Sequence, residues 1–203
     1  MSSPLLSLRS VKLPRGFAGE LNVDFAAGVH LVVGPNGVGK TSLLNCIAGT
    51  LATASGTISL DGASLTPGSS RVVLAPNTPP DIPWIRAGLL LEFIVSLYPA
   101  TAQGAEAAAT VVERLGITPF MNAPLGTLSA GTARKLLLAA ALIAAPPVLL
   151  FDEPTNDIDA PSSAAFVAMM GAAAAQRVVL VTTHHTADLK ELAPGLLDLA
   201  ARR

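Results

Sequence analysis

The segment that most constrains this chain is a glycine-rich loop between an apolar run and a helical run. Residues 29–33 (VHLVV) lead into the loop Gly34–Thr41, which fits the pattern G-x-x-x-x-G-K-[ST], and a helical pattern follows from Ser42. In such a loop the backbone N–H groups surround phosphate oxygens, and the next helix adds the positive end of its dipole. The pattern predicts a phosphate-binding site. A plain glycine-rich turn is the alternative, but Lys40 and Thr41 stand in register for phosphate binding.

Each position of this loop has an expected role. Gly37 and Gly39 permit the turn and leave room for phosphates, because they carry no Cβ. We expect Lys40 to neutralise the outer phosphates, Thr41 to bind Mg²⁺ and Ser42 to touch an inner phosphate. The residues expected around the phosphates are Gly34, Asn36, Gly37, Val38, Gly39, Lys40, Thr41 and Ser42.

Two adjacent carboxylates end a second apolar run. Residues 148–151 (VLLF) lead directly into Asp152 and Glu153. The carboxyl ends of parallel strands form the ligand-binding edge of such a sheet. We expect Asp152 to hold Mg²⁺ through water and Glu153 to act as the general base on an attacking water. A helix N-cap after a strand is the alternative for this pair.

Strand-like and helical runs alternate along the chain, which predicts an α/β fold with a mostly parallel sheet covered by helices. A further run at 57–60 followed by Asp61-Gly62 predicts a hairpin in a side sheet. Between Pro79 and Leu128 only helical patterns occur, over 85–98 and 103–115. We therefore expect one domain over 1–203 with a small helical insertion at about 81–128.

Composition limits the class of partner. Thirteen basic and 14 acidic residues give a net charge of −1, so we expect no nucleic-acid partner, which would call for a basic face. The longest apolar run, 136–151, contains Pro146 and Pro147 and is shorter than the roughly 20 residues of a membrane span. The amino terminus lacks a secretory pattern, so we expect a cytoplasmic protein in which Cys46 is a small core residue.

A third motif identifies a family. Leu128–Thr132 (LSAGT) precedes a helical run that leads into the acidic strand, and it resembles the signature sequence, usually LSGGQ, of ATP-binding cassette (ABC) ATPases. Residues 156–159 (NDID) resemble the D-loop of that family, and 182–185 (TTHH) its switch-histidine segment. The resemblance extends from about Leu6 to His185. It implies a P-loop NTPase with a RecA-like core, an N-terminal antiparallel β region and an inserted helical subdomain.

The resemblance also implies a mechanism. ATP with Mg²⁺ would be hydrolysed between two such domains, identical or different, which face each other head to tail. The nucleotide on one phosphate loop would be covered by Ser129 and Gly131 of the other domain, and an N-cap serine at a helix start suits an anion. His184 would contact the γ-phosphate. Phe17 would stack on the base, with an ordinary core position as an equal alternative.

Two positions depart from the family pattern. Asn77 stands where the Q-loop has glutamine, so its contact with Mg²⁺ or attacking water would need a bridging water or local movement. Thr132 replaces the last signature residue. We expect altered communication between domains, with nucleotide binding retained.

The resemblance further implies an ATP-binding subunit that powers a separate membrane permease and lies peripherally on the inner face of the cell membrane. We expect the permease to dock on residues 77–98, which include Trp84. The short length resembles bacterial exporter cassettes, including the haem-exporter type. The alternative is a non-transport or degenerate cassette that acts as a nucleotide-gated switch.

Overall fold

Two β-sheets form the framework of the protein. The computed structural model describes residues 4–99, 101–183, 189, 192 and 194–201. A five-stranded parallel sheet has the order β6 (Val72–Ala75), β7 (Val148–Asp152), β8 (Val178–Thr182), β3 (Gly28–Val33) and β9 (Gly195–Asp198). A four-stranded antiparallel sheet has the order β2 (Leu21–Phe25), β1 (Leu6–Lys12), β4 (Ser55–Leu60) and β5 (Ala63–Ser64). The predicted α/β class with an N-terminal antiparallel region is confirmed.

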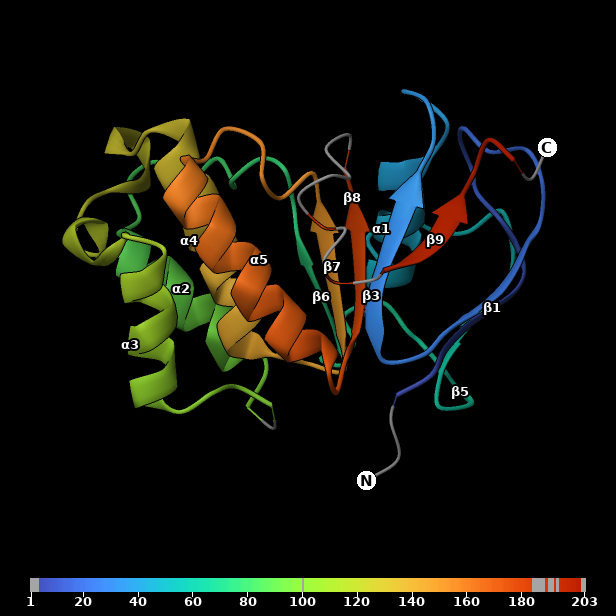
Figure 1. Ribbon diagram of the computed structural model, residues 1–203, viewed down its shortest axis with the longest axis horizontal. Coiled ribbons are helices and arrows are strands. Elements are labelled where there is room, and N and C mark those ends of the chain that lie inside the picture. The colour runs from blue at the N-terminus through green and yellow to red at the C-terminus, as the bar shows by residue number, and fades with distance from the viewer. Residues whose placement is uncertain (1–3, 100, 184–188, 190–191, 193, 202–203) are drawn as a thin grey trace.

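The helices separate into two groups around the parallel sheet (Figure 1). The helix α1 (Lys40–Ala48) packs between this sheet and the antiparallel sheet. On the opposite face, α4 (Ala130–Ala144) and α5 (Ala160–Ala174) pack against the sheet, and α2 (Ala87–Ser96) and α3 (Ala105–Arg114) pack against α4. Two 3₁₀ turns, η1 (Thr118–Phe120) and η2 (Leu125–Thr127), precede α4. The helical insertion predicted from the sequence corresponds to α2, α3 and these turns.

Side chains of the central strands alternate between two cores. In β7, Leu149 and Phe151 face the core shared with α4 and α5, whereas Val148 and Leu150 face the core shared with α1. All four are fully buried. This alternation follows from the period of two along a strand, and burial on both faces explains why the run is continuously apolar.

The long apolar run at 136–151 is divided between a helix and a strand. Residues 136–144 form the buried carboxyl-terminal part of α4, Ala145 ends the helix with φ 46°, and β7 begins at Val148. In the described part of the chain, no helix has the length and apolar character that crossing a membrane requires.

The predicted hairpin is present, while β9 was not predicted. Asp61 and Gly62 have φ of 54° and 79°, which is the backbone of a two-residue turn between β4 and β5. The edge strand β9 was missed, because four residues (GLLD) are too few to show a period.

Candidate functional site

The carboxyl ends of the parallel strands and the start of α1 enclose a cavity of about 460 Å³. Its lining residues include most of those predicted from the phosphate loop and the acidic strand end. They are Arg15, Gly16, Asn36, Gly37, Gly39, Lys40, Thr41, Ser42, Asn77, Asp152 and Glu153. Segments more than 100 residues apart in the sequence therefore meet at one edge of the sheet, as expected for this topology. Arg15 was not predicted.

The helix α1 begins without a side-chain cap. Its N-cap residue is Gly39, with φ 109°, and no side chain of the described residues accepts a hydrogen bond there. A Cβ on Gly39 would lie 3.1 Å from the backbone nitrogen of Phe17 and 3.2 Å from the carbonyl oxygen of Arg15. Glycine is thus required by both the backbone angle and the close neighbours. The first N–H groups of α1 are left for a ligand that accepts hydrogen bonds.

The side chain of Lys40 folds over the loop that precedes it. Its Nζ donates to the carbonyl oxygens of Gly34, at 2.9 Å, and Pro35, at 3.4 Å. The residue is only 9% exposed. A buried ammonium held by two neutral carbonyls is suited to exchange them for anionic oxygens, because hydrogen bonds between opposite charges are stronger.

Two hydroxyl groups hold the carboxylate of Asp152. Thr41 Oγ1 donates to it, at 2.9 Å from Oδ2 and 3.2 Å from Oδ1, and Thr182 Oγ1 donates to Oδ1 at 2.6 Å. Asp152 and Thr182 are both buried. A hydroxyl and a carboxylate this close together are oxygen donors of the kind that Mg²⁺ prefers, with water and phosphate completing its shell. Among the described residues no cluster of three or more His, Cys, Asp or Glu could hold a metal alone.

Glu153 has an unusual backbone. Its φ is 48°, in the left-handed region, which costs a non-glycine residue about 1–2 kcal/mol. The carbonyl and the hydroxyl of Thr182 both accept hydrogen bonds from the N–H of Glu153, at 3.1 and 3.0 Å. This conformation redirects the chain directly after the buried Asp152, so that both acidic residues line the same cavity.

The signature residues do not line this cavity. Ser129 is the N-cap of α4, and its Oγ accepts a hydrogen bond from the N–H of Thr132 at 3.1 Å and lies 2.9 Å from the Thr132 hydroxyl. A Cβ on Gly131 would come within 2.3 Å of the carbonyl oxygen of Asp157. Gly131 is therefore required for the packing of α4 against the predicted D-loop in the same chain. Thr132, one of the two departures from the family pattern, takes part in the cap.

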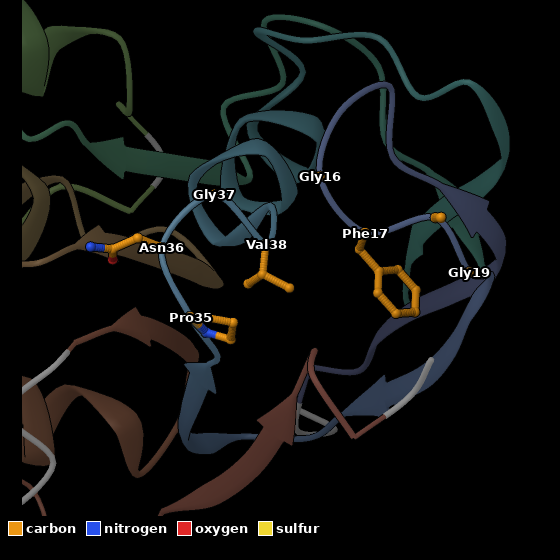
Figure 2. Close-up of a pocket in the computed structure, with 8 residues that line it drawn as sticks. Gly16, Phe17, Gly19, Pro35, Asn36, Gly37 and Val38 are labelled. Atoms are coloured by element: carbon orange, nitrogen blue, oxygen red, sulfur yellow. The ribbon is translucent and has the colours of Figure 1, made fainter.

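A second cavity of about 640 Å³ lies beside the first and shares Gly16, Asn36 and Gly37 with it. The ring of Phe17 and the side chain of Val38 border the space, and the amide of Asn36 points away from the ring (Figure 2). Phe17 is only 4% exposed and belongs to the core around α1. This burial favours the core alternative for Phe17, and its role in base stacking stays a prediction.

Two side chains near the acidic residues were not predicted. Thr182 was missed because only the register of β7 and β8 shows that it lies opposite Asp152. Arg134, on α4, reaches backbone carbonyls at the ends of β6 and β7. Conversely, the predicted switch residue His184 lies outside the described residues.

The chain matches the ABC transporter family over residues 19–156. It is 33% identical over 144 residues to the cytochrome c biogenesis ATP-binding export protein CcmA of Cupriavidus pinatubonensis, with 66% of this chain and 62% of that protein covered. It is 35% identical over 130 residues to the ABC transporter ATP-binding protein RamB of Streptomyces coelicolor, with 57% and 21% covered. The chain thus spans less than two thirds of the length of these relatives.

Solved structures agree in fold. A putative ABC transporter ATP-binding protein from Pyrococcus furiosus has a TM-score of 0.80 at 22% identity, with 98% of both chains covered. A bacterial Atm1-family ABC exporter with ATP bound has a TM-score of 0.78 at 20% identity, with 98% of this chain and 38% of that chain covered. The family match spans more than half of the chain, and the motifs lie where the fold requires them. The chain therefore belongs to the ABC transporter family, as an ATP-binding cassette of the ABC ATPase class.

Proposed function

We propose that this chain binds ATP with Mg²⁺, hydrolyses it to ADP and phosphate, and thereby powers a membrane permease. The observation that carries the proposal is the cavity that joins Lys40, Thr41, Asp152 and Glu153. A cation, a helix start and two carboxylates at one edge of the sheet form the donor and acceptor set that phosphoryl transfer to water needs.

The phosphates would occupy the cavity above α1. Lys40 Nζ would exchange the carbonyls of Gly34 and Pro35 for phosphate oxygens, and the uncapped N–H groups of α1 would donate to further oxygens. Thr41 and Asp152 would hold Mg²⁺, which neutralises phosphate charge when bound. The neighbouring cavity beside Phe17 would take the nucleoside.

Glu153 would act on the attacking water. Its carboxylate accepts a proton from the water, whose oxygen bonds to the γ-phosphorus, while the bond from that phosphorus to the bridging oxygen breaks and ADP leaves. Asn77 lines the same cavity and would orient the water with its side-chain amide. The assignment of His184 to the γ-phosphate rests on the family resemblance.

A second cassette would complete the site. Ser129 and Gly131 lie outside the cavity that contains Lys40, so within one chain they are not placed to contact the same nucleotide. The start of α4 offers a hydroxyl and the positive end of a 15-residue helix. In a head-to-tail dimer, identical or mixed, this end would cover the partner's ATP.

The permease would dock on the apolar side of α2. Its solvent-facing residues Leu89, Phe93 and Leu97 are 55%, 60% and 52% exposed and follow at helical spacing, and Trp84 just before the helix is 71% exposed. Such a stripe on a surface helix is typical of an interaction site. The cassette would then lie on the cytoplasmic face of the membrane. This surface falls within the segment predicted for docking from the sequence, residues 77–98.

Glu153→Gln tests the hydrolysis proposal. The wild-type chain should release phosphate from ATP in the presence of Mg²⁺, and the variant should turn over about 10²- to 10⁴-fold more slowly because it has lost the general base. The variant should still bind ATP and should shift toward a dimer in size-exclusion chromatography with ATP. A wild-type chain no faster than the variant would refute hydrolysis and favour a nucleotide-gated switch.

A Phe93→Ser variant tests the docking surface. It should fold and hydrolyse ATP like wild type, because Phe93 is exposed and does not line the cavity. Unlike wild type, the variant should no longer co-purify with a polytopic membrane protein from detergent-solubilised cells of the source organism. Retention of that protein at full strength would refute docking through α2.

A further inference from the structure

A buried arginine links the signature helix to the catalytic edge of the sheet. Arg134 lies on α4, five residues after the N-cap Ser129, and is only 3% exposed. Its Nη1 donates to the carbonyl oxygen of Pro76 at 3.2 Å, and its Nη2 donates to the carbonyl oxygens of both Asp152 and Glu153. One guanidinium therefore contacts the main chain beside three residues of the proposed site, Asn77, Asp152 and Glu153.

The contacts of Arg134 differ from those of an ordinary buried ion pair. Among the described residues, its side chain donates hydrogen bonds to backbone carbonyls, and its Nε has no hydrogen-bond partner. Burial lowers the pKa of the guanidinium, and the negative charges of Asp152, Asp157 and Glu153 oppose that shift. A buried cation is weakly justified by stability alone, since an apolar side chain of similar size often serves as well.

The two strands that Arg134 joins are neighbours. In the parallel sheet β6 pairs with β7, with Ala75 opposite Phe151, so Pro76 directly follows β6 and Asp152 is the last residue of β7. The planar guanidinium presents its donors in a fixed fork, which can hold several acceptors in one arrangement. Glu153 needs such support because its backbone is in the left-handed region. Thr182 holds its N–H, and Arg134 holds its carbonyl.

We propose that Arg134 is a positioning residue for ATP hydrolysis, which sets the main-chain geometry of Glu153 and of the loop at Asn77 relative to the signature helix. This inference rests on the proposed ATPase activity. A change in the position of α4, whose first turn would contact the partner's nucleotide, is passed through the guanidinium to the segments that carry the general base and the water-orienting amide. The ATP-binding loop is not among its contacts.

The position of Arg134 predicts a separation of turnover from binding. In Arg134→Met, which keeps the apolar stem and removes the fork, kcat should fall about 10- to 100-fold, as for other small misplacements of catalytic groups. The dissociation constant of a fluorescent ATP analogue should stay within about twofold, because Lys40 and the α1 start are unchanged. Arg134→Lys keeps the charge but has fewer donors. Its kcat should lie between those of wild type and Arg134→Met.

Lys135→Met is the matched control. Lys135 is the next residue on α4, but its Nζ contacts Asp159 Oδ2 at 3.0 Å and Ser162 Oγ at 3.2 Å, away from the acidic strand end. Its removal should leave kcat within about twofold of wild type, as is usual for a partly exposed ion pair. Circular dichroism melting of all variants establishes that they fold, and if Arg134→Met does not fold, the kcat of Arg134→Lys decides.

The outcomes separate this inference from the proposed function. A wild-type chain that hydrolyses ATP while the folded Arg134 variants keep its kcat overturns the positioning role and leaves the ATPase proposal intact. A parallel loss of ATP affinity and kcat also overturns it, because that points to general damage of the nucleotide site. A wild-type chain without Mg²⁺-dependent hydrolysis overturns both proposals.

Discussion

The helices α1 and α4 both begin at the edge of the molecule where anions would bind, but their first turns differ. At α1 the N-cap is Gly39, and no described side chain caps the helix. At α4 the N-cap is Ser129, whose Oγ already accepts from the N–H of Thr132. The first turn of α1 therefore depends on a ligand to satisfy its N–H groups, whereas in the first turn of α4 a side chain already satisfies the N–H of Thr132.

This difference matches the two roles that we propose. An uncapped helix start with a neighbouring lysine suits a phosphate that one chain binds by itself. The serine hydroxyl at the start of α4 would contact a phosphate only when a second domain approaches. In the proposed function, the start of α1 would bind nucleotide within a single chain, whereas the start of α4 would contact it only in a dimer.

The strongest loss of nucleotide binding is expected from a change at the start of α1. Lys40→Met should weaken ATP binding to the isolated chain about 10- to 100-fold, since charge-assisted hydrogen bonds to phosphate are lost. Lys12→Met, which removes an exposed cation of β1 paired with Glu20, serves as the control and should leave binding unchanged. Titration with a fluorescent ATP analogue measures both. Equal affinities for Lys40→Met and wild type would contradict the assignment of α1 to the phosphates.

An intermediate effect is expected at α4. Ser129→Ala should lower the free energy of unfolding by about 1 kcal/mol through loss of the cap, and should leave ATP affinity of the isolated chain unchanged. Thr132→Val keeps the capped N–H and removes only the neighbouring hydroxyl. It should therefore lower the free energy of unfolding by less than Ser129→Ala does. Chemical unfolding followed by circular dichroism measures the stabilities. Weakened ATP binding by the monomeric Ser129→Ala chain would contradict the assignment of α4 to the partner's nucleotide.

The smallest effect is expected at α5, where the cap carries a charge. Hydrogen bonds from the N–H and hydroxyl of Ser162 and from Lys135 hold the pKa of Asp159 well below its usual range. A carboxyl group with a pKa lowered by folding adds stability above its unfolded pKa of about 3.9, and this contribution is lost as the pH falls toward the folded pKa. The stability advantage of wild type over Asp159→Asn should therefore shrink on acidification from pH 7 to pH 3.

The neutral cap at α4 provides the control for that measurement. The decrease in the free energy of unfolding caused by Ser129→Ala should stay constant over the same range of pH, because a serine hydroxyl does not titrate there. Parallel pH dependence of the two variants would show that the acid response arises elsewhere in the protein.

Sequence patterns predicted those parts of the site that depend on local chemistry. The loop from Gly34 to Thr41 needs its glycines and lysine at fixed spacing, and the acidic pair needs a buried strand directly before it. The alternation of strands and helices likewise indicated the parallel sheet. These features are local, so a short stretch of sequence is enough to show them.

The missed features depend on tertiary contacts. Arg134 acts on carbonyls 58, 18 and 19 residues away, and any residue type can supply a carbonyl. The role of Thr182 appears only once β7 and β8 are paired in register. The burial of Phe17 depends on how the segment before β2 folds against α1, which its own neighbours in sequence do not specify.

The exposure of Trp84 affects how the protein can be observed. It is the sole tryptophan of the chain, and 71% of its surface faces solvent in the folded state. Its emission should therefore already resemble that of a tryptophan in water, and it should change little when the chain unfolds. The same indole lies on the proposed docking surface, so a blue shift on reconstitution with a membrane partner would report assembly directly, in a protein whose folding is nearly silent to this probe.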